Sequence, residues 1–419
     1  MIIIIGSVIV LFILFVWALK KWGMNAIYGI LPANILIEVI MFYSKTDSFS
    51  TGYIRGAFLI LFLFIYLRKF EFEPVSNAIA IFLGYTFLLT FFSSNMSGSF
   101  IYFSKVFINF MMFPVGFFVV KQFSDLKKLN WALIASLLII IAQFIFAQVT
   151  FGGQSNPYVA TGIRLGGTNI QITYLAALGI ALFPLLFKFI SRKKDKILLS
   201  TLLFSALALI FLIFRRISIL VAVFAIIFHV FSSSKQPKKF RYLALFFIVL
   251  IPIVLISSAW FSDTINDRLF SRGLQEEGRY WETGIVLKEL FSSPKQFLVG
   301  KELFNSAEYF IARYGLYRQL HMDFNIILHG SGIIGLVLFL NVFLKIIFYI
   351  KKSPSQIKRL PDFIFFRKYI ILLLISFALF TISGSLNSIS YGTFMFFYLG
   401  AFCKLIRIVA KSNLKTTSF

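Results

Sequence analysis

Residues 278–339 read GRYWETGIVLKELFSSPKQFLVGKELFNSAEYFIARYGLYRQLHMDFNIILHGSGIIGLVLF, and they form the most polar long segment of the chain. Their end runs directly into an apolar stretch that begins at Asp323 and is long enough to enter a membrane. Arg279 and Glu282 stand three positions apart, so a helix would place both on one face. The segment therefore predicts a polar helical layer that is joined to a membrane span.

A stripe of polar side chains marks the junction between this layer and the span. His321, Asn325 and His329 recur at every fourth position, which puts them on one face of a helix. A histidine at the outer end of a span can accept a proton near neutral pH, so His321 is the candidate general base. Asp323 is the rival base, but on a helix it lies about 160° away from His321. If the helix begins at Asp323, this residue would cap it, and we prefer that structural role.

The composition assigns the chain to the membrane proteins. Of its 419 residues, 59% are hydrophobic and only 14% are charged, whereas soluble domains are about 45–50% apolar. The apolar runs are continuous, which argues against the alternating pattern of an outer-membrane barrel. Because each run of roughly 17–25 residues can cross a bilayer, we predict an all-α polytopic membrane protein with about 12–13 transmembrane helices.

The candidate spans alternate with clusters of basic residues. The spans lie near residues 2–20, 24–43, 53–67, 77–95, 101–120, 131–150, 168–189, 197–214, 216–232, 242–260, 323–350, 369–386 and 391–409. The basic clusters lie around residues 20–21, 68–69, 121–128, 188–196, 235–241, 345–368 and 404–415. Cytoplasmic loops are enriched in Lys and Arg, so we place these clusters in the cytoplasm and the N-terminus outside. The net charge of +25 thus follows membrane topology and predicts no binding to nucleic acid.

This topology divides the chain into four regions. They are N-terminal transmembrane scaffold helices (1–150), transmembrane helices with periplasmic loops that bear arginines (151–260), a large periplasmic loop (261–322) and C-terminal transmembrane helices (323–419). A loop as long as the third region is expected to be structured and functional. We expect it to form a cap, with short helices near residues 264–272, 277–291 and 302–316.

Several cations lie at the outer face, against the topology rule. Arg164 stands in a glycine-rich loop, and Arg215 and Arg216 interrupt an apolar hairpin. Neighbours on a helix diverge by about 100°, so only one of these two arginines can point inward, and the sequence leaves open which one. Arg55 and Lys105 lie near the outer ends of their spans, where they either contact a substrate or extend to the interface.

The order of these motifs resembles that of a known family. It is similar to the O-antigen ligase and O-antigen polymerase superfamily of bacterial envelope glycosyltransferases. The resemblance covers residues 150–345. The motifs that carry it are Arg279 with Pro294 and Gly300, then His321-x-x-x-Asn325, then Gly330-x-Gly332-x-x-Gly335-Leu336, together with Arg164 to Asn169 and Arg216-Ile217-Ser218.

The resemblance implies a GT-C-like fold with a periplasmic cap and an inverting glycosyltransferase. Its donor would be a glycan on undecaprenyl diphosphate, whose leaving phosphate gathers negative charge. Arginines stabilise such charge without a metal or a cofactor, because they are planar and permanently charged. We assign diphosphate binding to Arg164, Arg215, Arg216 and Arg279, catalysis to His321 and Arg279, and accessory roles to Arg55, Lys105, Asp323 and Asn325.

Within this family we favour a polymerase that adds a growing O-antigen, capsule or exopolysaccharide chain to a new lipid-linked repeat unit. The alternatives are an O-antigen ligase that transfers polymer to lipid A–core and a ligase that glycosylates protein. The implied partners are the lipid-linked oligosaccharide donor, a glycan or lipid A–core acceptor, membrane lipids, a chain-length regulator and a flippase. The implied location is the bacterial inner membrane, with the active site facing the periplasm.

Other classes of protein are weighed against this reading. A polysaccharide or lipid-glycan transporter would line a central path with cations and repeat broken helices in matching halves. Here the outer-face arginines gather at one face, and the sequence has no internal repeat. The chain also has no Asp-x-Asp, P-loop or zinc motif, so a nucleotide-sugar donor is not expected. Its single cysteine, Cys403, excludes an internal disulfide.

Overall fold

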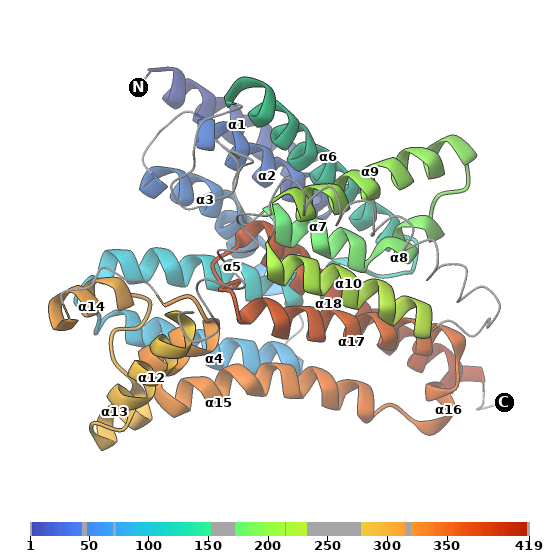
Figure 1. The fold of residues 1–419 in the computed structure, drawn as a ribbon. Coiled ribbons are helices and arrows are strands. Elements are labelled where there is room, and N and C mark those ends of the chain that lie inside the picture. The colour runs from blue at the N-terminus through green and yellow to red at the C-terminus, as the bar shows by residue number, and fades with distance from the viewer. Residues whose placement is uncertain are drawn as a thin grey trace.

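The computed structural model describes residues 2–43, 48–69, 73–151, 172–213, 215–232, 278–314 and 320–416, and every regular element in these ranges is helical (Figure 1). The first elements are α1 (Ile2–Trp22), η1 (Gly23–Ala26), α2 (Ile27–Tyr43), α3 (Ser48–Tyr66), η2 (Leu67–Lys69), α4 (Pro74–Thr90), α5 (Met96–Val119) and α6 (Asp125–Phe151). The middle elements are α7 (Ile172–Ala181), α8 (Phe183–Lys188), α9 (Lys193–Leu212) and α10 (Arg216–Phe231). The last are α12 (Gly278–Leu290), α13 (Pro294–Val299), α14 (Ser306–Tyr314), α15 (Asp323–Lys351), α16 (Ser355–Lys358), α17 (Pro361–Thr381) and α18 (Ile389–Thr416). The prediction of an all-α protein is confirmed for these ranges.

Five of the described helices contain a stretch that is long and apolar enough to cross a membrane. These stretches are Met96–Val119, Asp125–Ala147, Asp323–Lys351, Pro361–Thr381 and Ile389–Lys411. The chain is therefore a multi-pass membrane protein. The other expected spans fall on α1 to α4 and α7 to α10, of which α4, α7 and α10 are short apolar helices. The expected span at 242–260 and the expected cap helix at 264–272 lie outside the described residues.

Prolines stand in the first turn of two short helices, α8 and α13. The span expected at 168–189 is interrupted at Leu182, because Pro184 lacks an N–H and sits in the first turn of a new helix, α8. Pro294 begins α13 after the turn that ends α12 at Leu290, and the Ser293 side chain accepts a hydrogen bond from Gln296 N. The expected cap helix at 277–291 is confirmed as α12.

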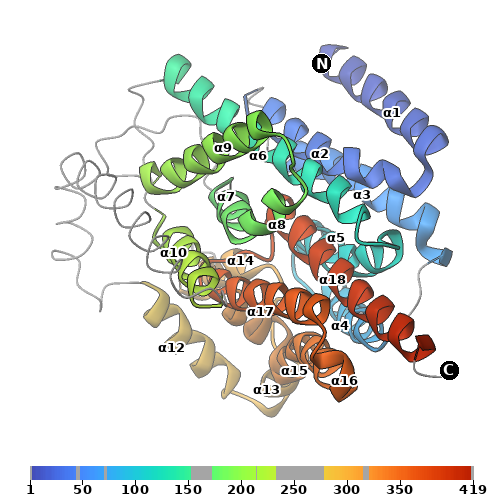
Figure 2. The same cartoon turned by 90° about the vertical axis from the view of Figure 1, so that its right-hand side faces the viewer.

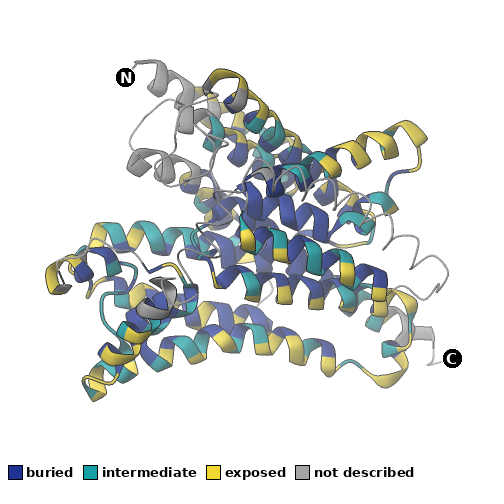
Figure 3. Cartoon of the chain, in the orientation of Figure 1, coloured by how far each residue is buried: buried dark blue, intermediate teal, exposed yellow. Residues whose placement is uncertain are grey.

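The core of the bundle is a seam between α5 and α18, two helices that come from opposite ends of the chain (Figures 1 and 2). A Cβ atom at Gly400 would lie 2.0 Å from the carbonyl oxygen of Phe113, and one at Gly116 would lie 2.2 Å from that of Phe397. Glycine at these positions lets the two backbones touch, as small residues do in membrane helix pairs. We call this contact the core seam. Buried residues gather in the middle of the bundle around it (Figure 3).

The two ends of the bundle differ. The short helices α12, α13 and α14 lie together at one end, and we call them the cap (Figure 1). The other end carries α8 and α16 and faces the viewer in Figure 2. The starts of α7, α10, α15 and α18 all lie toward the cap (Figure 1). Residues far apart in the sequence therefore meet beneath the cap.

Candidate functional site

Helix α12 of the cap docks on the start of α15 through a buried carboxylate. Glu282 is fully buried, and its Oε1 atom lies 2.9 Å from His321 Nδ1. Its Oε2 atom accepts a hydrogen bond of 3.1 Å from the main-chain N–H of His321. The His321 side chain is nevertheless 57% exposed. One buried carboxylate thus holds both the main chain and the ring of a histidine that stays accessible.

This pairing decides which imidazole nitrogen can act as a base. An ionised carboxylate only accepts hydrogen bonds, so Nδ1 of His321 carries the proton when it pairs with Glu282. The lone pair of Nε2 is then available to take a proton from another group. The carboxylate also fixes the orientation of the ring, as the acid does in an acid–histidine pair of a hydrolase triad. The two side chains together have the chemistry of an oriented general base.

The polar stripe of α15 serves as a docking seam for the cap. Asn325 Nδ2 donates a hydrogen bond of 3.0 Å to Thr283 Oγ1 in α12. Deeper in the span, the main-chain carbonyl of His329 accepts a hydrogen bond of 2.6 Å from Lys301 N. Both contacts join α15 to the cap on the side of His321. We call this set of contacts, made by His321, Asn325 and His329, the cap seam.

A second polar cluster stiffens the cap itself. The buried carboxylate of Glu289 lies 2.7 Å from Arg313 Nε and accepts a hydrogen bond of 2.6 Å from the Tyr309 hydroxyl. The Tyr309 ring packs against the His329 imidazole, with 5.1 Å between the two centroids. His329 is almost fully buried. It therefore supports the cap, whereas His321 presents its ring to solvent.

Asp323 does not have the role that the sequence predicts. Met322 is the N-cap residue of α15, and no side chain caps this end of the helix. The fully buried Asp323 carboxylate instead accepts hydrogen bonds from Ser385 N (2.8 Å), Ser385 Oγ (3.1 Å) and Leu386 N (3.1 Å). The predicted N-cap role of Asp323 was wrong. Its carboxylate accepts hydrogen bonds from a loop that is distant in the sequence, and not from the main-chain N–H groups of its own helix. Asp323 anchors the loop between α17 and α18, and its burial leaves it no access to solvent.

The anchored loop also packs against the main chain of His321. Gly384 has a φ of +77°, a conformation that favours glycine. A Cβ atom at Gly384 would lie 2.6 Å from the carbonyl oxygen of His321. The loop therefore supports His321 from below while Glu282 holds it from the cap.

The same loop meets Arg215, which lies just before α10. The Arg215 guanidinium stacks over the Tyr174 ring at 4.5 Å from the centroid and donates a hydrogen bond to the Tyr174 hydroxyl. That hydroxyl lies 2.7 Å from Ser383 Oγ and donates to Ser383 O at 3.1 Å. Arg215 is half-buried, whereas Arg216 is exposed. The inward arginine is therefore Arg215. Its partner Tyr174 contacts Ser383, which directly precedes Gly384, the residue that packs on the His321 main chain.

The remaining predicted site residues are placed only in part. Lys105 lies in α5 and is half-buried. Arg55 lies in α3 and Arg279 lies in α12, three residues before Glu282, and their side chains are outside the described residues. Arg164 lies in the range 152–171, which is also outside them. The structure thus places His321 and Asn325 at the cap seam and connects Asp323, and Arg215 through Tyr174, to the loop between α17 and α18.

Sequence reasoning missed the partners that hold this site. The sequence placed Glu282 beside Arg279 on its own helix, and it gave no sign that the Glu282 carboxylate also holds His321. Tyr174 and Ser383 carried no motif, although both connect Arg215 to the site. The sequence showed only that Glu282 is a carboxylate in the polar segment that precedes His321. Nothing in the sequence specified which residue it would contact.

Comparisons with known proteins do not assign the chain to a family, so its class of protein is defined by the fold and the site. No protein-family model, no curated protein and no solved structure matches the chain. Within the described ranges, no group of three or more His, Cys, Asp or Glu side chains forms a metal site. The fold and the described contacts define a multi-pass helical membrane protein with a docked polar cap and an accessible histidine–carboxylate pair.

Proposed function

We propose that the protein transfers a glycan from undecaprenyl diphosphate to the hydroxyl group of an acceptor sugar. The single observation that supports this most is the exposed His321, oriented by a buried Glu282 at 2.9 Å. Its motif also resembles that of the O-antigen polymerase and ligase superfamily. Within that family we favour a polymerase of O-antigen, capsule or exopolysaccharide repeat units.

In the proposed reaction His321 acts as the general base. Its Nε2 atom takes the proton of the acceptor hydroxyl, and the oxygen attacks the anomeric carbon. The bond between that carbon and the diphosphate oxygen breaks in the same displacement, which inverts the anomeric configuration. The carboxylate of Glu282, which lies 2.9 Å from Nδ1, stabilises the imidazolium that forms.

The leaving diphosphate requires positive charge close to the histidine. Arg215 fits this need, because its side chain packs inward on Tyr174 and that contact adjoins the loop that touches His321. Fixed donors aimed at a developing phosphate charge stabilise the transition state more than water does. Arg279, Arg164 and Arg216 are further donors in this proposal, each assigned from its motif alone.

Two other functions remain as alternatives to a polymerase. An O-antigen ligase would use the same base and the same arginine, with lipid A–core or a protein as acceptor. A lipid-glycan transporter would need cations along a path through the membrane. The described contacts favour transfer chemistry, because Arg215 directly precedes α10 and His321 lies just before α15, and both helices begin toward the cap (Figure 1).

The proposal also places the protein in the inner membrane of a bacterium, with the cap in the periplasm. Basic residues follow the ends of α8, α15 and α16 at the opposite end of the bundle, which fits the cytoplasmic side. In this arrangement the donor, the acceptor, a chain-length regulator and a flippase would approach from the periplasmic side or within the membrane.

A gel of envelope glycans from the source cell with this gene deleted tests the proposal. A polymerase predicts that single repeats stay on their normal acceptor while long chains vanish. A ligase predicts that long chains persist on the lipid carrier while the acceptor stays bare. Single repeats that build up on the cytoplasmic side would support the transporter and contradict the transferase.

A further inference from the structure

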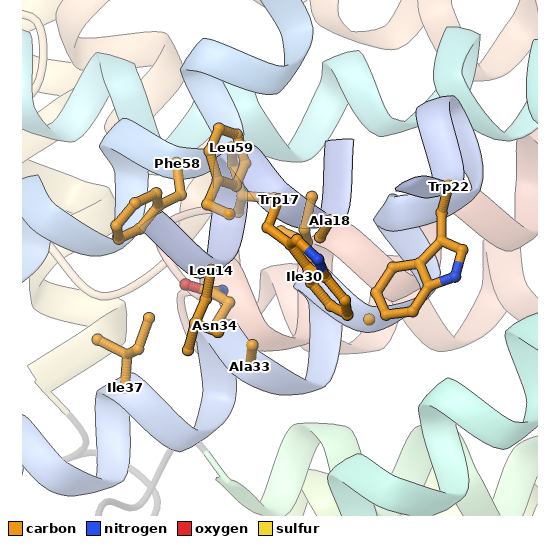
Figure 4. A pocket seen from close by; sticks show the side chains of 12 residues that line it. Leu14, Trp17, Ala18, Trp22, Ile30, Ala33, Asn34, Ile37, Phe58 and Leu59 are labelled. Atoms are coloured by element: carbon orange, nitrogen blue, oxygen red, sulfur yellow. The ribbon is translucent and has the colours of Figure 1, made fainter. Parts of the chain in front are cut away.

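A groove opens between α1, α2 and α3, away from the cap seam (Figure 4). Its volume is about 230 Å³, well above the ~30 Å³ that one water molecule occupies in the liquid. The lining is apolar apart from Asn34, and it includes Trp17, Trp22, Ile30 and Phe58. A groove of this shape and chemistry accepts a hydrocarbon chain.

Small residues on α2 keep the groove open. Gly29 and Ala33 both line it. A Cβ atom at Gly29 would meet no other atom within 4 Å, so this part of the groove has spare room. The neighbouring side chains of α1 are apolar and exposed, among them Phe12, Ile13 and Leu14. Because such a surface on a membrane protein faces lipid, the groove opens toward the hydrocarbon of the bilayer.

Cations surround one end of the groove. The Lys21 ammonium lies 4.7 Å from the Trp17 ring centroid and 5.6 Å from that of Trp22. Lys20 lines an adjoining groove between α1 and α3. The two tryptophans also pack edge to face at 5.0 Å. Tryptophan and lysine are the residues that anchor membrane proteins at the headgroup level.

Helix α3 brings two further cations to the same end. Tyr66 approaches the turn after α1, because a Cβ atom at Gly23 would lie 3.9 Å from its hydroxyl. Arg68 and Lys69 follow directly in η2, and Lys69 Nζ lies 5.4 Å from the Tyr66 ring centroid. Both side chains are exposed. Lys21 thus contacts the lining of the groove, and three further cations, Lys20, Arg68 and Lys69, lie at the same ends of α1 and α3.

We propose that this groove binds one anionic phospholipid. An acyl chain lies between α1 and α2, and the headgroup phosphate contacts the cations at the mouth. The charges favour an anionic lipid over a zwitterionic one, because each basic residue near an anionic membrane surface adds binding energy. The long apolar lining favours a lipid over a free phosphate ion, which has no group to fill it.

The site can be tested on the purified full-length protein by titration with phosphatidylglycerol and phosphatidylcholine of identical acyl chains. Bound lipid is measured by native mass spectrometry, and quenching of tryptophan fluorescence by brominated acyl chains locates it near Trp17 and Trp22. The wild-type protein should prefer phosphatidylglycerol. The double variant Lys20→Gln and Lys21→Gln should weaken phosphatidylglycerol binding roughly 25-fold, since each lysine is worth about fivefold, and leave phosphatidylcholine unchanged.

Two further variants separate the groove from general surface charge. Ala33→Leu fills the groove without changing its charge, so it should weaken both lipids alike. The control variant Lys193→Gln and Lys194→Gln removes two exposed lysines from the start of α9 and should leave binding unchanged. The proposal is overturned if the control variant weakens binding as much as the Lys20 and Lys21 variant, if Ala33→Leu has no effect, or if inorganic phosphate displaces the lipid.

Discussion

The core seam and the cap seam hold the same protein together by different means. In the core seam, α5 and α18 touch through their backbones at Gly116 and Gly400, and apolar side chains fill the surroundings. In the cap seam, α12 and α15 meet through a carboxylate, an amide and a histidine. The core seam has no accessible reactive group among these contacts, and the cap seam has one, His321. Stability and chemistry are thus separated along the bundle, and each can be broken without the other.

The largest expected effect comes from removing the base. His321→Ala should lower glycan transfer about 10²–10⁴-fold, because general-base catalysis contributes that much. The protein should still insert, but it should unfold at a lower temperature than the wild type, because the buried Glu282 carboxylate loses the imidazole as a partner. Transfer is measured with a lipid-linked substrate in membranes, and thermal unfolding is measured in detergent.

His321→Asn is the matched control for this prediction. Its side-chain amide can donate to Glu282 as Nδ1 does, but it has no second nitrogen that can accept a proton. It should be as inactive as His321→Ala. Transfer by His321→Asn at the wild-type rate would show that His321 only docks the cap.

The next largest effect is expected at Arg215, and its neighbour Arg216 provides the comparison. Arg215→Gln should lower transfer about 10²–10³-fold, the usual loss for a fixed donor to a developing negative charge. Arg216→Gln should change it much less, because Arg216 is exposed and Arg215 packs on Tyr174. The same transfer assay decides between them. A larger loss in Arg216→Gln would reverse the assignment of the inward arginine.

A third prediction breaks the core seam and leaves the cap seam alone. Gly400→Ala should destabilise the protein by about 3 kcal/mol, the upper end for overpacking, because its Cβ would lie 2.0 Å from the Phe113 carbonyl oxygen and the two backbones must separate. Gly84→Ala is the control, since a Cβ there meets no atom within 4 Å. Thermal unfolding in detergent reports both. If the two variants were equally stable, the backbone contact at Gly400 would not contribute to the stability of the core seam.

The smallest effect concerns the residue that positions the base. Glu282→Gln keeps the shape of the side chain and removes its charge, so transfer should fall about 10–100-fold, as it does when a group that orients a reactive side chain is lost. The loss should appear in kcat, with KM nearly unchanged, because Glu282 is fully buried and does not contact substrate. A rise in KM with an unchanged kcat would assign Glu282 to substrate binding or to cap docking alone.

Several features of the cap seam were accessible from the sequence. The polar segment before a membrane span predicted the helix at 277–291, observed as Gly278–Leu290. The spacing of His321, Asn325 and His329 predicted one helical stripe, and it holds for Asn325 and His329. His321 lies two residues before α15 begins, yet all three contact the cap through side chains or main chain. Such features depend on neighbours within a few turns, so local periodicity is enough to predict them.

The partners of those residues were not accessible from the sequence. Glu282 and His321 are 39 positions apart, and Tyr174 and Ser383 are 209 positions apart. Each position offers several donors and acceptors, and only the packing of distant helices selects among them. For the same reason the sequence favoured an N-cap role for Asp323, whereas its carboxylate accepts hydrogen bonds from the loop between α17 and α18.

The sequence by itself determined that this chain is an all-helical, multi-pass membrane protein with a polar helical segment before one span. Apolar length and helical period are local properties, and a bilayer requires the backbone to satisfy its hydrogen bonds within each segment. Tertiary structure alone decided that Glu282 orients His321, that Arg215 rather than Arg216 turns inward, and that Asp323 holds a loop. Those outcomes depend on which buried polar groups are brought within hydrogen-bond distance, and that is set by helix packing across the whole chain.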